Sequence, residues 1–171
     1  MMGGMTPVAV RSYRPSDHSA GRHLWAELTR QHNEMYGETA DDSGAGFEEY
    51  LTRLDLSGLW VADHADDGVI GMVGLIMRDR AGEVDPVVVT ATHRHKGVGR
   101  LLLQHVAAEA KNRNMTSLTI SPESRNVDAI RSLHAAGYDV VSSIELTMDL
   151  DRHSHAWHEE GLQLHELPFK S

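Results

Sequence analysis

Residues 93–100 read His93-Arg94-His95-Lys96-Gly97-Val98-Gly99-Arg100, and they join a run of valines to an amphipathic helix. The start of a helix carries unpaired backbone N–H groups and the positive end of the helix dipole, and both favour a phosphate group. Gly97 and Gly99 would let a diphosphate approach the backbone without a Cβ in the way. The three basic side chains of the stretch supply counter-charge. This stretch therefore predicts a phosphate-binding loop at the beginning of a helix.

The segment before this loop, Glu83 to Thr90, is rich in valine and predicts a strand that is buried on both faces. Pro86 interrupts it. Proline cannot donate to a sheet ladder, so its place inside a central strand predicts a bulge or a local parting of strands. Backbone groups close to the loop would then be free to bond something other than the next strand.

The rest of the chain alternates strand and helix signals, which predicts an α/β (α+β) fold. Apolar spacing and capping residues predict helices from Ser16 or Asp17 to about Met35, at 47–54, from Gly97 onward, and from Asn126 to Gly137. Strands are expected at 8–11, 59–62, 69–77, 83–90, 116–121, 138–141 and 144–150. The turn Asp66-Asp67-Gly68 predicts a hairpin between the second and third of these strands.

Length and composition limit the classes of protein to consider. The 171 residues suffice for one domain with a full core, and we expect this domain to span 1–150. The absence of cysteine fits a cytoplasmic protein, and no apolar run is long enough for a membrane helix. A net charge of −9 argues against nucleic-acid binding. The segment 92–113 nevertheless holds five basic residues against one acid, which indicates a local anionic ligand.

The segment 151–171 is a histidine-rich tail, or an extra helix, that we expect to pack on the domain. It holds His153, His155, His158 and His165, together with Trp157. Spacings of three or four residues could bring two imidazoles onto one metal ion. No carboxylate or cysteine pattern completes such a site, so the docking of Trp157 is the favoured interpretation. We expect no metal site and no catalytic role for the tail.

The order of these motifs resembles the GNAT superfamily of acyl-CoA-dependent N-acetyltransferases. The resemblance rests on the strand, Arg94-His95-Lys96-Gly97-Val98-Gly99, a helix, a strand, and then Asn126-Val127-Asp128-Ala129 with Gly137-Tyr138. It covers Val8 to Leu150 in element order and is specific between Glu83 and Tyr138. It implies a central mixed, mostly antiparallel sheet that is splayed at a bulge and flanked by helices. It also implies acetyl-CoA as co-substrate, a primary amine as acceptor, and a homodimer formed through the late strands or the tail.

The resemblance assigns cofactor-binding roles to individual residues. The pyrophosphate loop corresponds to Arg94, His95, Lys96, Gly97, Val98, Gly99 and Arg100, which act mostly through backbone amides. The strand residues Val87, Val88 and Val89 correspond to positions whose main chain contacts pantetheine and thioester in relatives, with the Val89 N–H as the expected oxyanion donor. Asn126 matches a position that commonly hydrogen-bonds the cofactor, and it serves equally well as a helix cap.

Two carboxylates are candidates for the general base. Glu83 stands fourteen residues before Gly97, where histone-acetylating members of the superfamily carry their glutamate. Strand alternation puts Glu83, Asp85, Val87 and Val89 on one side of an ideal strand, and Asp85 is the alternative base. Either carboxylate could act through water.

The general acid and the acceptor are less defined. Many relatives have a tyrosine seven residues after the asparagine, and here that residue is Leu133. A thiolate is a tolerable leaving group near neutrality, so direct transfer remains possible without this acid. Tyr36, Tyr50 and Tyr138 stay open as substitutes. The acidic residues between Glu34 and Glu49 would attract a cationic amine, or are simply solvated. The alternative function is a non-catalytic acetyl-CoA-binding sensor.

Overall fold

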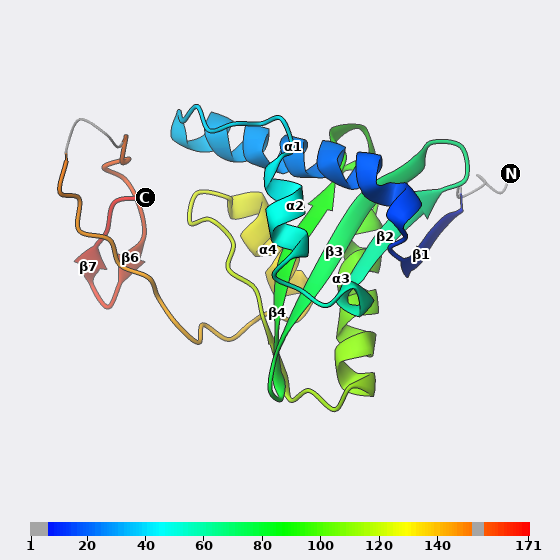
Figure 1. Ribbon diagram of the computed structural model, residues 1–171. Coiled ribbons are helices and arrows are strands. Elements are labelled where there is room, and N and C mark those ends of the chain that lie inside the picture. Colours follow the sequence, from blue (N-terminus) through cyan, green and yellow to red (C-terminus); the bar gives the residue numbers. More distant parts are fainter. Residues whose placement is uncertain (1–6, 152–155) are drawn as a thin grey trace, which may run out of the picture. The chain divides into compact units, whose positions relative to one another are not determined.

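The computed structural model describes residues 7–151 and 156–171 of the chain. The chain divides into two compact units, of which one holds the residues up to Arg30 together with Asp41–Ile120. The other holds Gln31–Ala40 and Ser121–Ser171. Figure 1 labels most of the helices and strands.

The elements follow one another along the chain as strands, α-helices and short 3-10 helices (η). They are β1 (Val8–Ser12), η1 (Pro15–Asp17), α1 (His18–Tyr36), α2 (Gly46–Leu51), η2 (Leu56–Gly58), β2 (Leu59–His64), β3 (Gly68–Arg78), β4 (Ala81–Val89), η3 (Ala91–His93), α3 (Val98–Asn112), β5 (Ser117–Thr119), α4 (Val127–Ala135), β6 (Gln163–Leu164) and β7 (Leu167–Pro168).

The first unit is built on a five-stranded sheet with the order β1-β2-β3-β4-β5. The first four strands are antiparallel neighbours, and tight turns join β2 to β3 and β3 to β4. β5 pairs parallel to β4, since α3 carries the chain back between the two strands. The sheet is therefore mixed and mostly antiparallel, and it confirms the predicted fold class.

Helices cover both faces of this sheet (Figure 1). On one face, Leu24 of α1 and the α2 residues Phe47 and Tyr50 pack with inward-facing strand side chains, among them Met72 and Val88. On the other face lies α3, whose His105 contacts Trp60 edge-on with ring centroids 5.3 Å apart. The valine strand β4 is thus an inner strand, and its side chains alternate between fully and partly buried positions.

The predicted bulge is present at Pro86. Val84 pairs with Leu75 and Val87 pairs with Val73, so β3 has Gly74 alone where β4 has two residues, Asp85 and Pro86. One extra residue on one strand of an antiparallel pair is a β-bulge. The Asp85–Pro86 peptide bond is cis.

The strands predicted at 138–141 and 144–150 are wrong, because the structure has no strand over these residues. Alternation alone does not make a strand, which needs a neighbour to take up its backbone hydrogen bonds. Among the described residues no strand runs beside this segment, and alternating side chains such as Leu146 and Met148 stay exposed.

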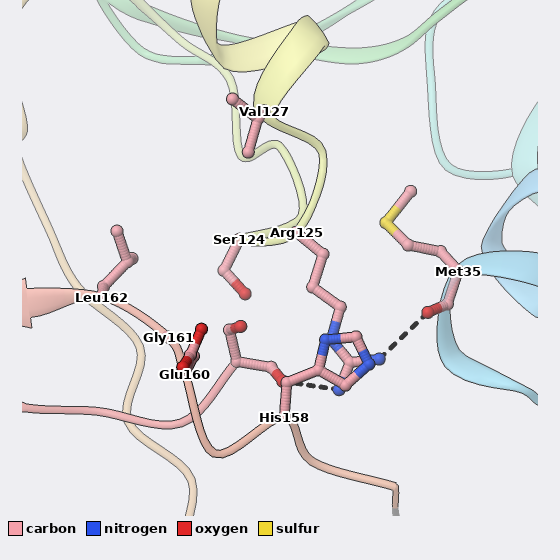
Figure 2. Close-up of a pocket in the computed structure, with 9 residues that line it drawn as sticks. Met35, Ser124, Arg125, Val127, His158, Glu160, Gly161 and Leu162 are labelled. Atoms are coloured by element: carbon pink, nitrogen blue, oxygen red, sulfur yellow. Dashed lines mark hydrogen bonds between the residues drawn. The ribbon is translucent and has the colours of Figure 1, made fainter.

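The second unit is organised around Arg125 (Figure 2). Its guanidinium donates to the carbonyl oxygens of Met35 at 3.0 Å, Ala156 at 2.6 Å and Ser171 at 2.5 Å. These bonds border a cavity of about 390 Å³.

The described part of the tail forms the hairpin β6–β7 in place of a helix, and the indole of Trp157 donates to Asp149 at 3.1 Å. His153 and His155 lie outside the described residues.

No helix within the described ranges is both long enough and apolar enough to cross a membrane.

Candidate functional site

Strands β4 and β5 separate partway along β4. Their parallel ladder joins Ala81 to Ser117, Gly82 to Leu118 and Glu83 to Thr119, and then ends. β4 continues to Val89 with β3 alone beside it in the part of the chain that the structure describes. This parting is the splay that the sequence predicts, and it leaves one edge of β4 open from Val84 onward.

The hydrogen-bond pattern shows which backbone groups face the open edge. Thr90 N–H donates to the Ile70 carbonyl of β3 at 2.8 Å. Bonding alternates residue by residue in an antiparallel ladder, so Val88 also faces β3, whereas Val87 and Val89 face away from it. The Val89 carbonyl accordingly accepts a bond from Arg94 Nε at 3.0 Å. The N–H groups of Val87 and Val89 therefore point into the splay, whereas the main chain of Val88 faces β3 in the ladder.

The phosphate-loop residues lie between η3 and the first turn of α3. Gly97 is the residue before the helix, and its φ of 87° is in the left-handed region that favours glycine. Val98 is buried and fixes the helix start to the core, while His95, Lys96 and Arg100 extend towards solvent. The first backbone N–H groups of α3 have no partner within the helix, so this end suits an anion.

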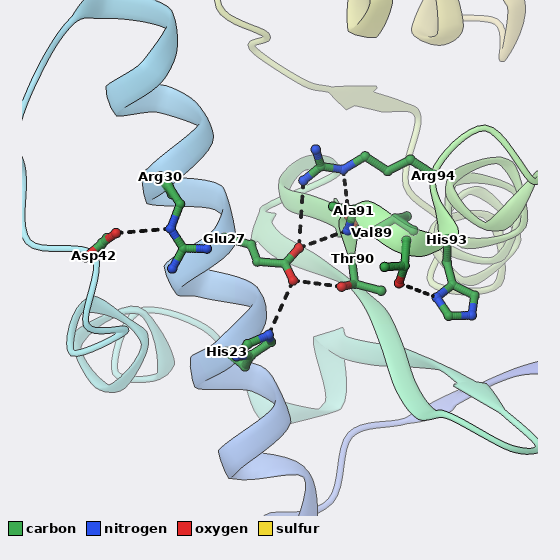
Figure 3. A network of polar contacts seen from close by, with 10 residues as sticks. His23, Glu27, Arg30, Asp42, Val89, Thr90, Ala91, His93 and Arg94 are labelled. Carbon is green, nitrogen blue, oxygen red and sulfur yellow. Dashed lines mark hydrogen bonds and ion pairs between the residues drawn. The ribbon is translucent and has the colours of Figure 1, made fainter.

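Glu27 of α1, which the sequence analysis missed, anchors the entry to this loop (Figure 3). Its carboxylate accepts from Thr90 Oγ1 at 2.7 Å and from the Ala91 N–H at 3.1 Å. Arg94 Nη2 lies 3.8 Å from the same carboxylate, whose side chain is only 12% exposed. The Arg94 side chain thus connects the Glu27 carboxylate to the Val89 carbonyl, and both contacts stabilise the loop. The sequence feature that could have identified Glu27 is its position as an acidic residue among the apolar residues Leu24, Trp25 and Leu28.

The two candidate bases differ in their surroundings. Glu83 is paired with Arg78, whose guanidinium lies 2.9 Å from the carboxylate. Asp85 is partly buried, and burial raises the pKa of its carboxyl, with repulsion from Glu83 acting in the same direction. Glu83 stands at the last paired position of the β4–β5 ladder, and Asp85 stands in the bulge.

Tyr50 fills the space that the bulge creates. Its hydroxyl donates to the Asp85 carbonyl at 2.7 Å, and burial raises the pKa of this hydroxyl. The bond passes directly over Gly74, where a Cβ would overlap the Tyr50 oxygen and lie 2.5 Å from the Asp85 carbonyl oxygen. Tyr50 therefore holds the backbone of the candidate base, and only glycine fits opposite it.

The remaining predicted residues belong to the second unit. Asn126 Oδ1 accepts from the Ala129 N–H at 3.1 Å, which confirms Asn126 as the cap of α4. Leu133 is buried. The hydroxyl of Tyr138 is buried and has no hydrogen-bond partner among the described residues, and burial raises its pKa, whereas Tyr36 donates to Glu123 at 2.8 Å.

Several acidic residues between Glu34 and Glu49 have local basic partners. Glu48 contacts His18 at 2.9 Å and Arg22 at 3.1 Å, and Asp42 contacts Arg30 at 3.2 Å. Glu38 contacts His32 at 3.3 Å. These contacts offset part of the negative charge that would attract a cationic amine, so they favour the simpler interpretation of a solvated acidic surface.

Comparison with known proteins identifies the matching family and structures of similar fold. The model of the acetyltransferase (GNAT) family matches residues 21–138. No curated protein matches the sequence. Among solved structures, PaiA N-acetyltransferase from Thermoplasma acidophilum, in complex with coenzyme A, superposes with a TM-score of 0.67 at 14% identity, over 81% of this chain and 93% of that chain.

Two further structures have a similar fold. An acetyltransferase of the GNAT family from Staphylococcus aureus gives a TM-score of 0.63 at 19% identity, over 84% of this chain and 95% of that one. A transcriptional regulator from Bacillus halodurans gives 0.64 at 18% identity, over 84% and 100%.

Proposed function

The chain belongs to the acetyltransferase (GNAT) family, and on this premise we propose that it transfers an acetyl group from acetyl-CoA directly to a primary amine. The observation that carries the proposal is the open edge of β4 beside the start of α3. The N–H groups of Val87 and Val89 suit an extended amide chain such as pantetheine. The first turn of α3, with Lys96 and Arg100, suits a diphosphate. We separately propose Asn126 as a cofactor contact on the basis of the family resemblance, since its helix cap uses the side-chain oxygen and leaves the amide NH₂ as a donor.

Acetyl-CoA supplies an activated thioester to this site. The Val89 N–H would donate to the carbonyl oxygen of the acetyl group and stabilise the negative charge that develops there. We propose Asp85 as the base that takes the proton from the ammonium group of the acceptor, directly or through water, with Glu83 as the alternative. Burial raises the pKa of Asp85, which favours it as a base, and Arg78 holds Glu83 in an ion pair. The amine nitrogen then bonds to the acetyl carbon, the C–S bond breaks, CoA leaves as a thiolate, and the nitrogen releases its second proton to the thiolate or to water.

The test is release of free CoA from acetyl-CoA in the presence of polyamines, amino acids, aminoglycosides or peptides. Release with one class of amine would establish the activity and identify the acceptor class.

The position of the diphosphate is tested by two matched variants, Lys96→Glu in the loop and Lys111→Glu at the far end of α3. We expect Lys96→Glu to raise the KM for acetyl-CoA about tenfold, because one charge-assisted contact to phosphate contributes on the order of 1.5 kcal/mol. Lys111→Glu should leave this KM unchanged. Equal KM values in the two variants would contradict the placement of the diphosphate.

A second candidate function is a non-catalytic acetyl-CoA-binding module. Leu133 at the usual tyrosine position favours it, and a protein described as a transcriptional regulator has a similar fold. This function predicts a large thermal shift with acetyl-CoA and no CoA release with any amine. Catalysis predicts the thermal shift together with CoA release in the presence of an acceptor amine.

We also propose a homodimer. The segment 138–150 exposes apolar side chains, including Val140 at 80% and Met148 at 82%, and an exposed apolar segment of this kind favours association. Sedimentation equilibrium would test it. A monomer at all concentrations would reject it.

A further inference from the structure

We propose that His64, Asp67 and His93 form a binding site for a divalent transition metal, with Zn²⁺ as the best-suited ion. The three side chains come together although 26 positions separate Asp67 from His93 along the chain. His64 ends β2, Asp67 lies in the turn before β3, and His93 ends η3 directly before the phosphate loop. This site is separate from the histidine-rich tail and does not depend on the proposed acetyl transfer.

The distances between the ligand atoms suit one small ion. His93 Nε2 lies 3.0 Å from Asp67 Oδ2, and His64 Nδ1 lies 3.5 Å from the same oxygen. The three ligand atoms lie within 4.8 Å of one another. Ligands at about 2.0–2.1 Å from a tetrahedral zinc are separated by about 3.3 Å. The cluster therefore needs only small side-chain adjustments to enclose the ion.

The protonation of His64 is already that of a metal ligand. Its Nδ1 accepts from the N–H groups of Asp66 at 3.2 Å and Asp67 at 3.1 Å, so this nitrogen carries a lone pair and no proton. A metal would take this lone pair in place of the two contacts. Both donors lie in an exposed turn, where water can replace the nitrogen as their acceptor.

His93 has the outer contact that metal-bound histidines usually have. Its second ring nitrogen, Nδ1, lies 3.0 Å from Thr92 Oγ1, and such a contact fixes the orientation of the ring. The side chains of His64 and His93 are 11% and 14% exposed, which limits their motion, while Asp67 is 55% exposed. Two imidazoles and a carboxylate are a common zinc ligand set, and the exposed side leaves the fourth position to water.

Metal binding at this position would connect the β2–β3 turn to the residue that precedes Arg94. The loop is already fixed on one side by Glu27, which bonds Thr90 and Ala91. The metal would fix His93, two residues further on.

The experiment is titration of the full-length, metal-free protein with Zn²⁺ by calorimetry and with Co²⁺ by visible absorption. The background is a variant in which His153, His155, His158 and His165 are replaced by Gln, because tail histidines bind metals weakly on their own. We expect one site per chain in this background, intense tetrahedral Co²⁺ bands, and a rise in Tm with Zn²⁺.

Asp67→Asn and His93→Gln should each weaken Zn²⁺ binding by more than the roughly 10–100-fold that loss of an outer partner causes. Asp67 is exposed, so Asp67→Asn tests the site without disturbing the core, and far-UV circular dichroism checks the fold of each variant. Absence of Co²⁺ bands and of calorimetric binding in the background variant would overturn the proposal. So would unchanged Zn²⁺ affinity in both substituted proteins.

Discussion

The two halves of β4 share one alternating burial pattern and have different partners. From Ala81 to Glu83 the strand is bonded on both edges, to β3 and to β5. From Val84 to Val89 its only strand partner among the described residues is β3, although burial alternates without interruption along the whole strand. The comparison shows that the burial pattern of a strand does not determine whether a neighbouring strand pairs with its edge. The point at which the neighbouring strand departs determines it.

The bulge lies at the boundary between the paired half of β4 (81–83), which has strands on both edges, and the open half (84–89), which pairs with β3. Asp85 and Pro86 lie opposite Gly74 alone, and Tyr50 donates to the carbonyl that the bulge displaces. Gly74 on β3 and Tyr50 on α2 therefore mark the boundary between the half of β4 that pairs on both edges and the half that pairs with β3.

The substitution Gly74→Ala should have the largest effect on this division. Its Cβ would collide with the Tyr50 hydroxyl and the Asp85 carbonyl, and backbone atoms cannot move aside cheaply. We expect a loss of about 3 kcal/mol in the free energy of unfolding, measured by urea denaturation. Gly82→Ala, in the paired half, is the control. Its Cβ meets the ends of flexible side chains, among them Leu75 and Leu118 at 2.6 and 2.8 Å, so the loss should be smaller. Equal losses would show that the bulge is not specially constrained.

Asp85→Asn and Glu83→Gln compare the carboxylates on the two sides of the division. If Asp85 is the base, Asp85→Asn should lower kcat about 100-fold, and Glu83→Gln should lower it only a few-fold. Fixed-time assays of CoA release with the best acceptor amine measure kcat for both variants. The reverse order would move the base to Glu83, and little change in either would move it to water.

Glu27→Gln should weaken the anchoring of the loop that follows the open half of β4. Loss of the anion weakens its bonds to Thr90 and Ala91 and its attraction for Arg94. We expect a three- to tenfold rise in the KM for acetyl-CoA at unchanged kcat, which corresponds to about 1 kcal/mol. Glu34→Gln, at an exposed position on the same helix, should change neither constant. A fall in kcat alone would be inconsistent with an anchoring role.

The smallest expected effect concerns stability against pH. Burial and Glu83 raise the pKa of Asp85 above its ordinary value of 3.8. The folded state then binds more protons than the unfolded state between the ordinary and the raised pKa, so the carboxyl costs stability as pH rises through this window. Asp85→Asn should therefore be more stable than wild type near pH 7, with the advantage shrinking towards pH 3.8. Tm values across this range test it, and a constant difference in Tm would refute it.

The sequence predicted those parts of the fold that local residues determine. Pro86 indicated the bulge, because proline has no N–H to donate to a ladder. Asn126 indicated a helix cap, and alternation placed Glu83, Asp85, Val87 and Val89 on one side of the strand. In the structure these four are partly buried while their neighbours are buried. It failed at 138–150, because alternation is a local signal whereas pairing requires a neighbour that the structure does not provide.

The contacts that connect distant segments were beyond local patterns. Glu27 contacts residues more than 60 positions away, and Tyr50 reaches Asp85 across 35 positions. The cluster of His64, Asp67 and His93 is likewise formed by the sheet, which brings a hairpin turn close to the end of η3. No spacing rule connects such residues, because the intervening chain varies freely in length.

The alternating directions of the β4 backbone have a consequence for hydrogen exchange. The amides of Val88 and Thr90 are bonded to β3, so their protons should exchange only when the sheet opens. The amides of Val87 and Val89 face the splay and should exchange quickly until a ligand covers them. Neighbouring residues of a single strand would then report two separate events. Slow protons would measure the stability of the fold, and fast ones would measure occupancy of the site.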